Sequence, residues 1–418
     1  MAHATDDAKS CRIAEANICF DGLRAPALTH TNGAINKDSD REYQMKVRAA
    51  VLDRMGAPPP YAASKPLTIT EVSIDPPGYG EVLVKIAAAG LCHSDLSVIE
   101  GNRPRPLPML LGHEAAAIVE ELGEGVHDLT VGDHVVLVFV PSCGHCGPCA
   151  EGRPALCEPG AVANHAGTLL SGERRIHCDG GPINHHMGCS AFAEYATVSR
   201  CSLIKVDRDL PLDEAALFGC AVLTGVGAVI NTARVQTGSS VAVIGLGGVG
   251  LAALLGAVAA GARSVIAIDL ADDKLGLARQ LGATETFNAG AASAAEAIRD
   301  ATNGGVEYAF EMAGSVRAMD LAYKITRRGG MTVTAGLPPP THTFNIPQVN
   351  LVAEERTVKG SYVGTCVPSR GIPRYVELYR RGKLPVDRLM SSHLRLDDIN
   401  VGFDLLREGK AVRQIITM

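Results

Sequence analysis

The stretch that decides the fold is Val241-Ala242-Val243-Ile244-Gly245-Leu246-Gly247-Gly248-Val249-Gly250. Its first residues form an apolar run typical of a buried strand, and a G-x-G-x-x-G pattern then opens an Ala- and Leu-rich stretch typical of a helix. Glycines let the backbone approach a pyrophosphate closely, and the positive end of the helix attracts that group. The stretch therefore predicts a dinucleotide-binding turn between a strand and a helix.

An acidic residue supports this interpretation. Asp269 ends the next predicted strand, Val265–Asp269, about 20 residues beyond the last glycine. A carboxylate there would accept hydrogen bonds from the adenosine ribose and would repel the extra phosphate of NADP, so we predict NAD as the cofactor. A glycine-rich turn that binds no ligand remains the alternative, and the strand–turn–helix context argues against it.

On both sides of this turn, the sequence pattern differs from one part of the chain to the next. From 220 to 364, short apolar strands alternate with helical stretches, which predicts a doubly wound parallel sheet of the Rossmann type. The predicted elements include strands at Val241–Gly245 and Met331–Gly336 and a helix at Val249–Ala260. Residues 45–219 show short strands and Gly/Pro turns instead, which favours a mainly β domain, and 365–418 are expected to return to that domain. Residues 1–44 have no clear period, and we expect a poorly ordered extension, or an artefact of an upstream start, before the folded part of the chain begins at Met45. The fold class is α/β.

Composition and charge restrict the function. The 418 residues are 46% hydrophobic and 20% charged, which is ordinary globular usage. A net charge of −6 without a basic cluster argues against nucleic acid as a partner, and no apolar stretch is long enough to predict a membrane span. The amino terminus lacks a basic region followed by an apolar core and a cleavage site, so a reduced, cytoplasmic protein is expected.

Two sets of side chains predict zinc. Cys143, Cys146, Cys149 and Cys157 supply four thiolates at close spacing, enough to complete a tetrahedral Zn²⁺ shell, so this site should be structural. His145 lies inside that cluster and is expected to be a solvated bystander. A zinc ribbon that binds nucleic acid would explain the four cysteines alone, but the acidic charge opposes it.

The second set is dispersed: Cys92, His113 and Cys220. Each of them alone could be an ordinary core residue, and their spacing does not bring them together. As a set they would leave one zinc position open for water or a substrate oxygen, which is typical of a catalytic site.

With these motifs together, the chain resembles the medium-chain zinc alcohol dehydrogenases from Met45 to Met418, and most closely their dimeric branch. The resemblance rests on the following motifs: Gly90-Leu91-Cys92-His93-Ser94-Asp95, Gly112-His113-Glu114-Ala115-Ala116, the four-cysteine cluster, Cys220 with Thr224, and the glycine turn. It implies a GroES-like, mainly β catalytic domain beside the Rossmann domain, two zinc ions per chain, NAD and a homodimer.

The resemblance also implies individual roles. Cys92, His113 and Cys220 would bind the catalytic zinc, with Glu114 near the metal and Asp95 orienting His113. Ser94 would take the proton of the alcohol, and Phe139 would line the substrate pocket. The implied cofactor contacts are His93, Thr224, Gly245, Leu246, Gly247, Gly248, Val249, Gly250, Asp269, Lys274 and Arg413. The remaining histidines, including His185 and His186, are expected to be surface or core residues.

Two positions depart from the family. Ser97 stands where many relatives have the histidine that ends the proton relay, and Ala161 stands where formaldehyde dehydrogenases acting on a glutathione adduct have an arginine. The expected activity is therefore reversible hydride transfer between NAD and a small primary or secondary alcohol. The alternatives are S-(hydroxymethyl)glutathione dehydrogenase and a non-catalytic structural Rossmann/zinc protein.

Overall fold

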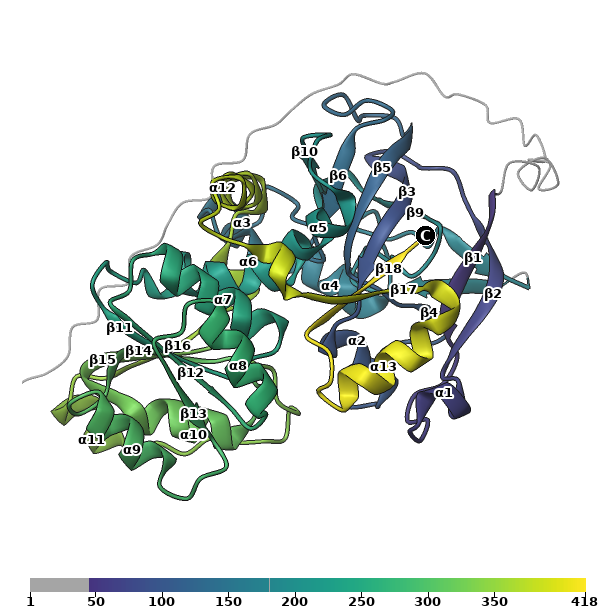
Figure 1. The fold of residues 1–418 in the computed structure, drawn as a ribbon. Coiled ribbons are helices and arrows are strands. Elements are labelled where there is room, and N and C mark those ends of the chain that lie inside the picture. Colours follow the sequence, from purple (N-terminus) through teal and green to yellow (C-terminus); the bar gives the residue numbers. More distant parts are fainter. Residues whose placement is uncertain (1–44, 180) are drawn as a thin grey trace, which may run out of the picture. The chain divides into compact units, whose positions relative to one another are not determined.

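The structure is a computed structural model that describes residues 45–179 and 181–418, all of which belong to one unit, Tyr43–Met418 (Figure 1). The predicted extension at residues 1–44 lies outside the described residues. The fold holds two sheets and a small closed barrel.

The carboxyl-terminal half contains a six-stranded sheet in the order β13-β12-β11-β14-β15-β16, and every neighbouring pair is parallel. Its strands are β11 Ser240–Ile244, β12 Ser264–Asp269, β13 Glu285–Asn288, β14 Val306–Glu311, β15 Thr326–Thr334 and β16 Thr357–Gly360. This is the strand order of a dinucleotide-binding Rossmann sheet, and the order reverses between β11 and β14. The crevice at the carboxyl end of β11 is thus the expected ligand position.

Helices cover both faces of this sheet (Figure 1). They are α7 Gly248–Ala259, α8 Asp272–Gln280, α9 Ala294–Ala301, α10 Val316–Ile325 and α11 Gln348–Ala353. All of β11 is buried: Val241 and Val243 join the apolar cluster that includes α7, and Ala242 and Ile244 join the cluster that includes α9 and α10. Because successive side chains of a strand point to opposite faces, a strand covered on both sides needs a continuous apolar run.

The amino-terminal half is mainly β. A closed barrel joins β1 Met45–Leu52, β2 Leu67–Ile74, β7 Ile176–Cys178, β8 Gly181–His185 and β4 Met109–Leu110. A seven-stranded sheet joins β10 Leu203–Val206, β6 His134–Leu137, β5 Glu114–Leu122, β3 Glu81–Gly90, β18 Arg413–Thr417, β17 Met390–Arg395 and, beside β3, β9 Tyr195–Ser199. The last strand of the chain, β18, pairs antiparallel with β3, so the carboxyl terminus returns to this half.

Two helices connect the sheets to the site. They are α2 His93–Ile99, which follows β3, and α6 Ala221–Gly227, which packs on α7. A Cβ at Gly225 would lie 2.3 Å from the carbonyl oxygen of Val249, so α6 approaches α7 this closely only with glycine there. The other helices are α1 Tyr61–Ser64, α3 Gly147–Ala150, α4 Glu158–Ala166, α5 Leu212–Ala216, α12 Pro368–Arg380 and α13 Ile399–Arg407.

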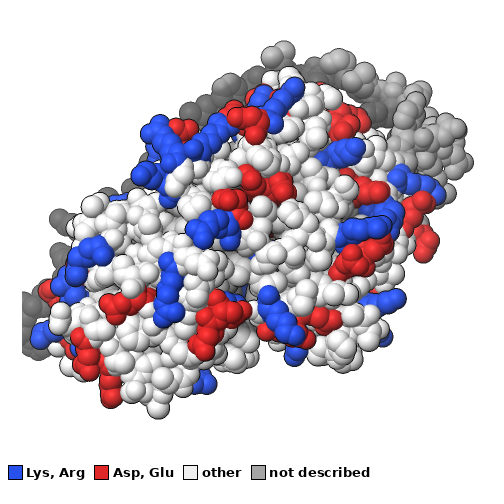
Figure 2. Space-filling view, viewed as in Figure 1, with Lys and Arg blue, Asp and Glu red and all other residues white. Residues whose placement is uncertain are grey.

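Within the described residues, no single helix has the length and apolar character needed to cross a membrane. The bent pair Leu212–Gly219 with Ala221–Ala233 reaches that length and composition only when its two members are taken together. On the face drawn in Figure 2, basic and acidic side chains are intermingled.

Candidate active site

The dispersed trio converges in the fold. Cys92 precedes α2, His113 precedes β5, and Cys220 precedes α6, yet their ligand atoms all lie within 4.8 Å of one another. Cys220 Sγ is 3.5 Å from His113 Nε2. Zinc bonds of about 2.3 Å to sulfur and about 2.0–2.1 Å to nitrogen, at a tetrahedral angle, put those two atoms about 3.6 Å apart. The three residues therefore fit a zinc ion with one open position.

Asp95 holds His113 in the required orientation. His113 Nδ1 donates to Asp95 Oδ1 at 3.0 Å, and both side chains are buried. With Nδ1 occupied, Nε2 is the nitrogen that faces the two sulfur atoms. Burial alone raises the pKa of a carboxyl group, but the neighbouring imidazoles His113 and His186 hold the pKa of Asp95 below its usual value. Asp95 thus remains an acceptor.

His186 also belongs to this cluster. The sequence predicted only that it would be a surface or core residue. Its Nδ1 lies 3.2 Å from Asp95 Oδ1, and its ring meets the His113 ring edge-on at 5.5 Å between centroids. Asp95 is consequently shared by two buried imidazoles. His185 is also buried, and its Nε2 accepts a hydrogen bond from the backbone N–H of Arg175, as a core histidine would. The adjacent pair His185-His186 was the only signal of this arrangement in the sequence.

Glu114 is buried between β5 and α6. Its Oε2 accepts from the backbone N–H of Ala221 at 3.1 Å, and its Oε1 lies 3.6 Å from Arg413 Nε. Burial raises the pKa of Glu114 to about 7, although the charge of Arg413 opposes this shift. A Cβ at Gly90 would lie 2.5 Å from Glu114 Oε1, so glycine at position 90 leaves the carboxylate its space.

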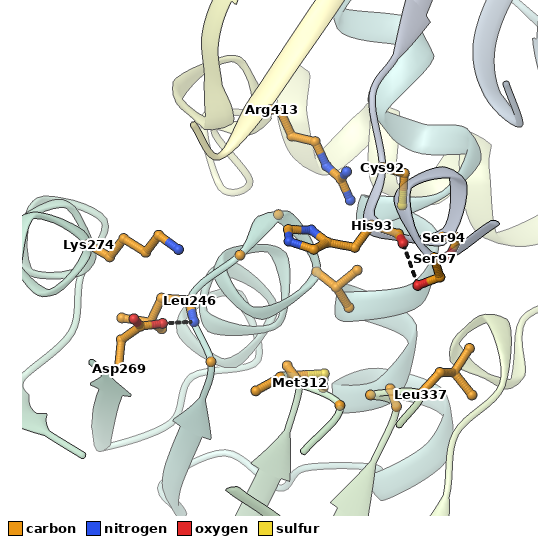
Figure 3. A pocket seen from close by; sticks show the side chains of 18 of the residues that line it. Cys92, His93, Ser94, Ser97, Leu246, Asp269, Lys274, Met312, Leu337 and Arg413 are labelled. Atoms are coloured by element: carbon orange, nitrogen blue, oxygen red, sulfur yellow. Dashed lines mark hydrogen bonds between the residues drawn. The ribbon is translucent and has the colours of Figure 1, made fainter. Parts of the chain in front are cut away.

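A cavity of about 400 Å³ is lined both by Cys92 of the trio and by the glycine turn (Figure 3). Its walls include Cys92, His93, Ser94, Ser97, Gly245, Leu246, Gly247, Gly248, Val249, Asp269, Lys274 and Arg413. In Figure 3, Asp269 and Lys274 lie at one end, Ser94 and Ser97 lie at the other, and His93 lies between them. Most of the residues predicted to bind the cofactor thus line one cleft.

The glycine turn has the shape that a pyrophosphate needs. Gly245 has φ +89°, and a Cβ at Gly250 would lie 1.7 Å from the carbonyl oxygen of Gly245, so both positions require glycine. A Cβ at Gly247 would meet nothing within 4 Å, which leaves open space beside the amino-terminal end of α7. Arg413 supplies a positive charge there, because its Nε would lie 2.2 Å from a Cβ at Gly248. An anion at this helix end therefore fits the residues present.

Asp269 is fixed at the opposite end of the cleft. Its Oδ2 accepts from the N–H of Leu246 at 2.6 Å, and its Oδ1 accepts from the N–H groups of Leu270 and Ala271 at 2.8 and 3.0 Å. A carboxylate has about four acceptor sites, so capacity for a ribose hydroxyl remains. Of the predicted cofactor contacts, Thr224 and Gly250 are the two that do not line this cavity: Gly250 packs under the turn, and Thr224 is half-buried on α6.

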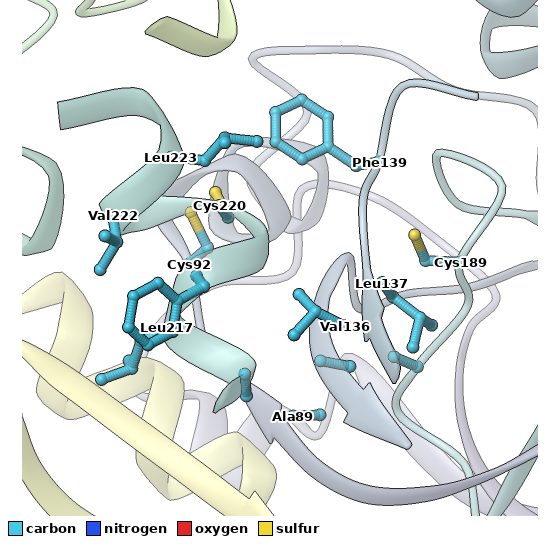
Figure 4. Close-up of a cluster of buried hydrophobic side chains, with 14 of the residues drawn as sticks. Ala89, Cys92, Val136, Leu137, Phe139, Cys189, Leu217, Cys220, Val222 and Leu223 are labelled. Atoms are coloured by element: carbon cyan, nitrogen blue, oxygen red, sulfur yellow. The ribbon is translucent and has the colours of Figure 1, made fainter. Parts of the chain in front are cut away.

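Apolar side chains surround the two cysteines of the trio. Figure 4 shows Phe139, Leu223 and Val222 around the two cysteines, Cys92 and Cys220. Phe139 contacts the His113 ring edge-on at 5.3 Å between centroids and the Tyr362 ring at 6.5 Å. These buried apolar side chains limit the access of water to the trio.

The four cysteines form a separate cluster. Ligand atoms of Cys143, Cys146, Cys149 and Cys157 also lie within 4.8 Å of one another. Backbone N–H groups donate to two of the sulfur atoms: Cys146 N to Cys143 Sγ at 3.3 Å, and Cys143 N and Gly160 N to Cys157 Sγ at 3.2 and 3.4 Å. Such donors stabilise thiolates, so this set also fits zinc, with all four positions filled by protein. His145 is exposed beside it and its Nδ1 bonds to the carbonyl oxygen of Cys143.

These features define a zinc-binding oxidoreductase with a nucleotide-binding sheet, and comparison with known proteins agrees. Residues 78–208 match the alcohol dehydrogenase GroES-like domain, and residues 248–380 match the zinc-binding dehydrogenase family. The chain belongs to the medium-chain zinc-dependent alcohol dehydrogenase family.

Solved structures of relatives share the whole fold. An alcohol dehydrogenase zinc-binding domain protein from Burkholderia ambifaria is 36% identical, with a TM-score of 0.85, over 90% of this chain and 99% of that chain. A benzyl alcohol dehydrogenase from Acinetobacter calcoaceticus is 35% identical, with a TM-score of 0.83 and the same coverage of both chains. A putative zinc-binding dehydrogenase from Sinorhizobium meliloti, bound to NADP, is 25% identical, with a TM-score of 0.72, over 90% of this chain and 100% of that chain.

Proposed function

We propose that this protein is an NAD-dependent alcohol dehydrogenase that interconverts a primary or secondary alcohol and its aldehyde or ketone in the cytoplasm. One observation carries the proposal: a single cavity is lined both by Cys92 of the trio and by the glycine turn from Gly245 to Val249. A substrate oxygen at the trio and a nicotinamide extending from the turn would share that cavity, as hydride transfer requires. The relative that acts on benzyl alcohol supports an alcohol as the substrate.

The roles of the residues follow from their positions. When bound, zinc supplies Lewis-acid chemistry that lowers the pKa of an alcohol, and NAD accepts the hydride. Ser94 lines the cleft beside Cys92 and receives the proton of the alcohol. Asp95 keeps His113 oriented, and Phe139 and its apolar neighbours exclude water. Arg413 and His93 would hold the pyrophosphate, and Asp269 and Lys274 would hold the adenosine ribose. Val249 in the cavity wall and Thr224 on α6, which does not line the cavity, would pack on the nicotinamide.

An assay of NADH absorbance with ethanol, 2-propanol, benzyl alcohol and S-(hydroxymethyl)glutathione tests the activity. We expect turnover of the simple alcohols and little of the glutathione adduct, because Ala161 on α4 offers it no cation. Zinc-loaded protein that oxidises none of the simple alcohols would contradict the proposal, and a strong preference for the adduct would assign the alternative activity.

Cofactor choice gives a separate prediction. Asp269→Ser should lower the preference for NAD over NADP by about 10- to 100-fold, because it removes a fixed negative charge and ribose acceptors. The measurement is kcat/KM for both cofactors. Asp273→Ser, which changes a carboxylate on α8 that does not line the cavity, serves as the control. Equal or better efficiency of the wild type with NADP would show that the role given to Asp269 is wrong.

We also propose that the protein is a homodimer, joined through the edge of the parallel sheet. All four residues of the edge strand β16 are exposed, and α11, which precedes it in the chain, has no buried residue. Val349 and Val352 on α11 have 67% and 75% of their surface exposed, which is unusual for valine. An exposed edge strand with apolar neighbours is a template for pairing with another chain.

Light scattering after size-exclusion chromatography tests the dimer. We expect wild type at twice the chain mass of 43.7 kDa and a shift toward monomer for Val352→Glu, because a carboxylate would enter the apolar interface. The matched control is Val162→Glu on α4, since Val162 is 70% exposed and lies far from the edge in sequence. A monomeric wild type, or identical masses for both variants, would contradict this interface.

A further inference from the structure

Two arginines near the trio have unusual surroundings. Arg103 and Arg105 are half-buried, and neither guanidinium has a hydrogen-bond or ion-pair partner anywhere in residues 45–179 and 181–418. Arg105 Nε is fully buried and unpartnered. Every other arginine in those ranges is either exposed or hydrogen-bonded or paired with another group. Because a buried donor without a partner is costly, the unpartnered Nε of Arg105 beside the second free cation, Arg103, points to an anionic ligand.

Both arginines lie near groups that surround the trio. Arg103 lines the cleft with Cys92 and Ser94, and it acts electrostatically on Tyr362 and Cys92. Arg105 acts electrostatically on Arg103, Tyr362 and His186. Tyr362 contacts Phe139, and His186 contacts His113, so the two cations belong to the surroundings of the zinc ligands.

The backbone holds this pair in place before any ligand binds. The segment reads Arg103-Pro104-Arg105-Pro106, and prolines fix their own φ and restrict the residue before them to extended conformations. In an extended segment, residues two apart point to the same side. The backbone N–H of Arg103 also donates to the carbonyl oxygen of Ser97 at 3.1 Å, which ties the segment to α2. Such preorganisation favours binding, since less flexibility is lost.

On the basis of the proposed alcohol dehydrogenase activity, we infer that the substrate carries a carboxylate, which Arg103 and Arg105 bind while its hydroxyl or carbonyl group lies at the trio. The substrate class is then a hydroxy acid in which the two groups are separated, or the corresponding oxo acid. Phe139 and Tyr362 provide an aromatic surface for the part of the molecule between them.

The cofactor is the other source of an anion, and the arrangement of charges disfavours it. The glycine turn already has its own cation in Arg413, beside Gly248. Lys274 and Asp269 lie together at the ribose end of the cleft, away from Ser94 and Ser97 (Figure 3). Arg103 lines the same cavity as the glycine turn, but Arg105 acts on Tyr362 and His186, neither of which lines that cavity.

Matched substrates test the inference. We would measure kcat/KM of the zinc-loaded full chain with NAD for 3- and 4-(hydroxymethyl)benzoate and 6-hydroxyhexanoate, each against its uncharged amide, with benzyl alcohol as reference. Bidentate arginine–carboxylate bonds predict at least one acid preferred over its amide by about 10- to 100-fold, mainly through KM. Arg103→Gln and Arg105→Gln should each remove most of that preference and leave the amides and benzyl alcohol within about 3-fold.

A binding experiment tests the inference without any need for turnover. Isothermal titration with benzoate and benzamide should show benzoate binding that both glutamine variants weaken, with zinc content unchanged. Arg263→Gln is the matched control, because its side chain is 66% exposed on the outside of the Rossmann sheet.

If wild type neither prefers any of the acids nor binds benzoate above benzamide, the inference is overturned while the proposed activity stands. If the glutamine variants raise KM for NAD rather than for the acids, the arginines belong to the cofactor. If no alcohol is oxidised, the proposed function fails, and the titration alone decides whether the two arginines bind a carboxylate.

Discussion

Cys220→Ala is expected to lower kcat for alcohol oxidation by on the order of 10³-fold or more, while the protein stays folded and keeps one zinc ion per chain. The loss follows from the position of Cys220 Sγ, 3.5 Å from His113 Nε2 and within reach of Cys92, where it completes a three-ligand set. Without it the site loses the Lewis acid whose charge stabilisation is worth several kcal/mol in the transition state. Elemental analysis and NADH absorbance measure both quantities.

The four-cysteine cluster should behave differently. Cys149→Ala removes a ligand from the closed set, so we expect reduced folding yield or solubility rather than a folded, inactive protein. Cys201→Ala is the control, because Cys201 is exposed and belongs to neither set. Active wild-type protein with a single zinc ion per chain would rule out two sites, and a folded Cys149→Ala protein with two ions would remove that cysteine from the ligands.

The sequence predicted the parts of the fold where local pattern and local structure coincide. The strand expected at Val241–Gly245 is β11, Ser240–Ile244, and the helix expected at Val249–Ala260 is α7, Gly248–Ala259. Both depend on a short-range signal, an apolar run broken by glycines with fixed roles. The strand expected at Met331–Gly336 is longer in the structure, Thr326–Thr334, because its start is the polar segment Thr326-Arg327-Arg328, which has no strand pattern of its own.

Features that depend on contacts between distant parts of the chain were harder to predict from the sequence. The trio unites residues from three separate parts of the chain, and no spacing rule joins Cys92 to Cys220; only the resemblance placed them together. His186, Arg103, Arg105 and Tyr362 were not assigned to the site, because a buried histidine or an unpaired arginine is recognisable only once its neighbours are known. The alternation Arg103-Pro104-Arg105-Pro106, soon after Cys92, was a local signal that could have drawn attention to this segment.

The second prediction with a large expected effect concerns two serines on α2. Ser94 and Ser97 are both half-buried, and both line the cleft, but they differ in their hydrogen bonds. Ser97 Oγ donates to the carbonyl oxygen of His93 at 2.8 Å, within the same helix, so its proton is already engaged. A hydroxyl also does not titrate near pH 7, so Ser97 cannot replace the histidine that many relatives have there. Ser94 lies nearer Cys92 in the chain and is the residue we propose to receive the proton of the alcohol.

Ser94→Ala should therefore lower kcat for alcohol oxidation by about 10²- to 10⁴-fold, the usual range for loss of a group that transfers a proton, whereas Ser97→Ala should stay within about 3-fold. The two substitutions are chemically identical and lie on one helix, so each controls for the effect of the other on folding.

Beyond Ser94 the proton is expected to leave through the cofactor ribose to water. Ser97→His would add an acceptor with a reference pKa of about 6.5, and oxidation should rise most below about pH 7, where hydroxide is scarce and the imidazole is still partly neutral. Profiles of kcat against pH for wild type and the three variants measure these effects. Comparable losses from the two alanine substitutions would place Ser97 in the proton path, and an unchanged acid limb in Ser97→His would show that proton release beyond Ser94 does not limit the rate.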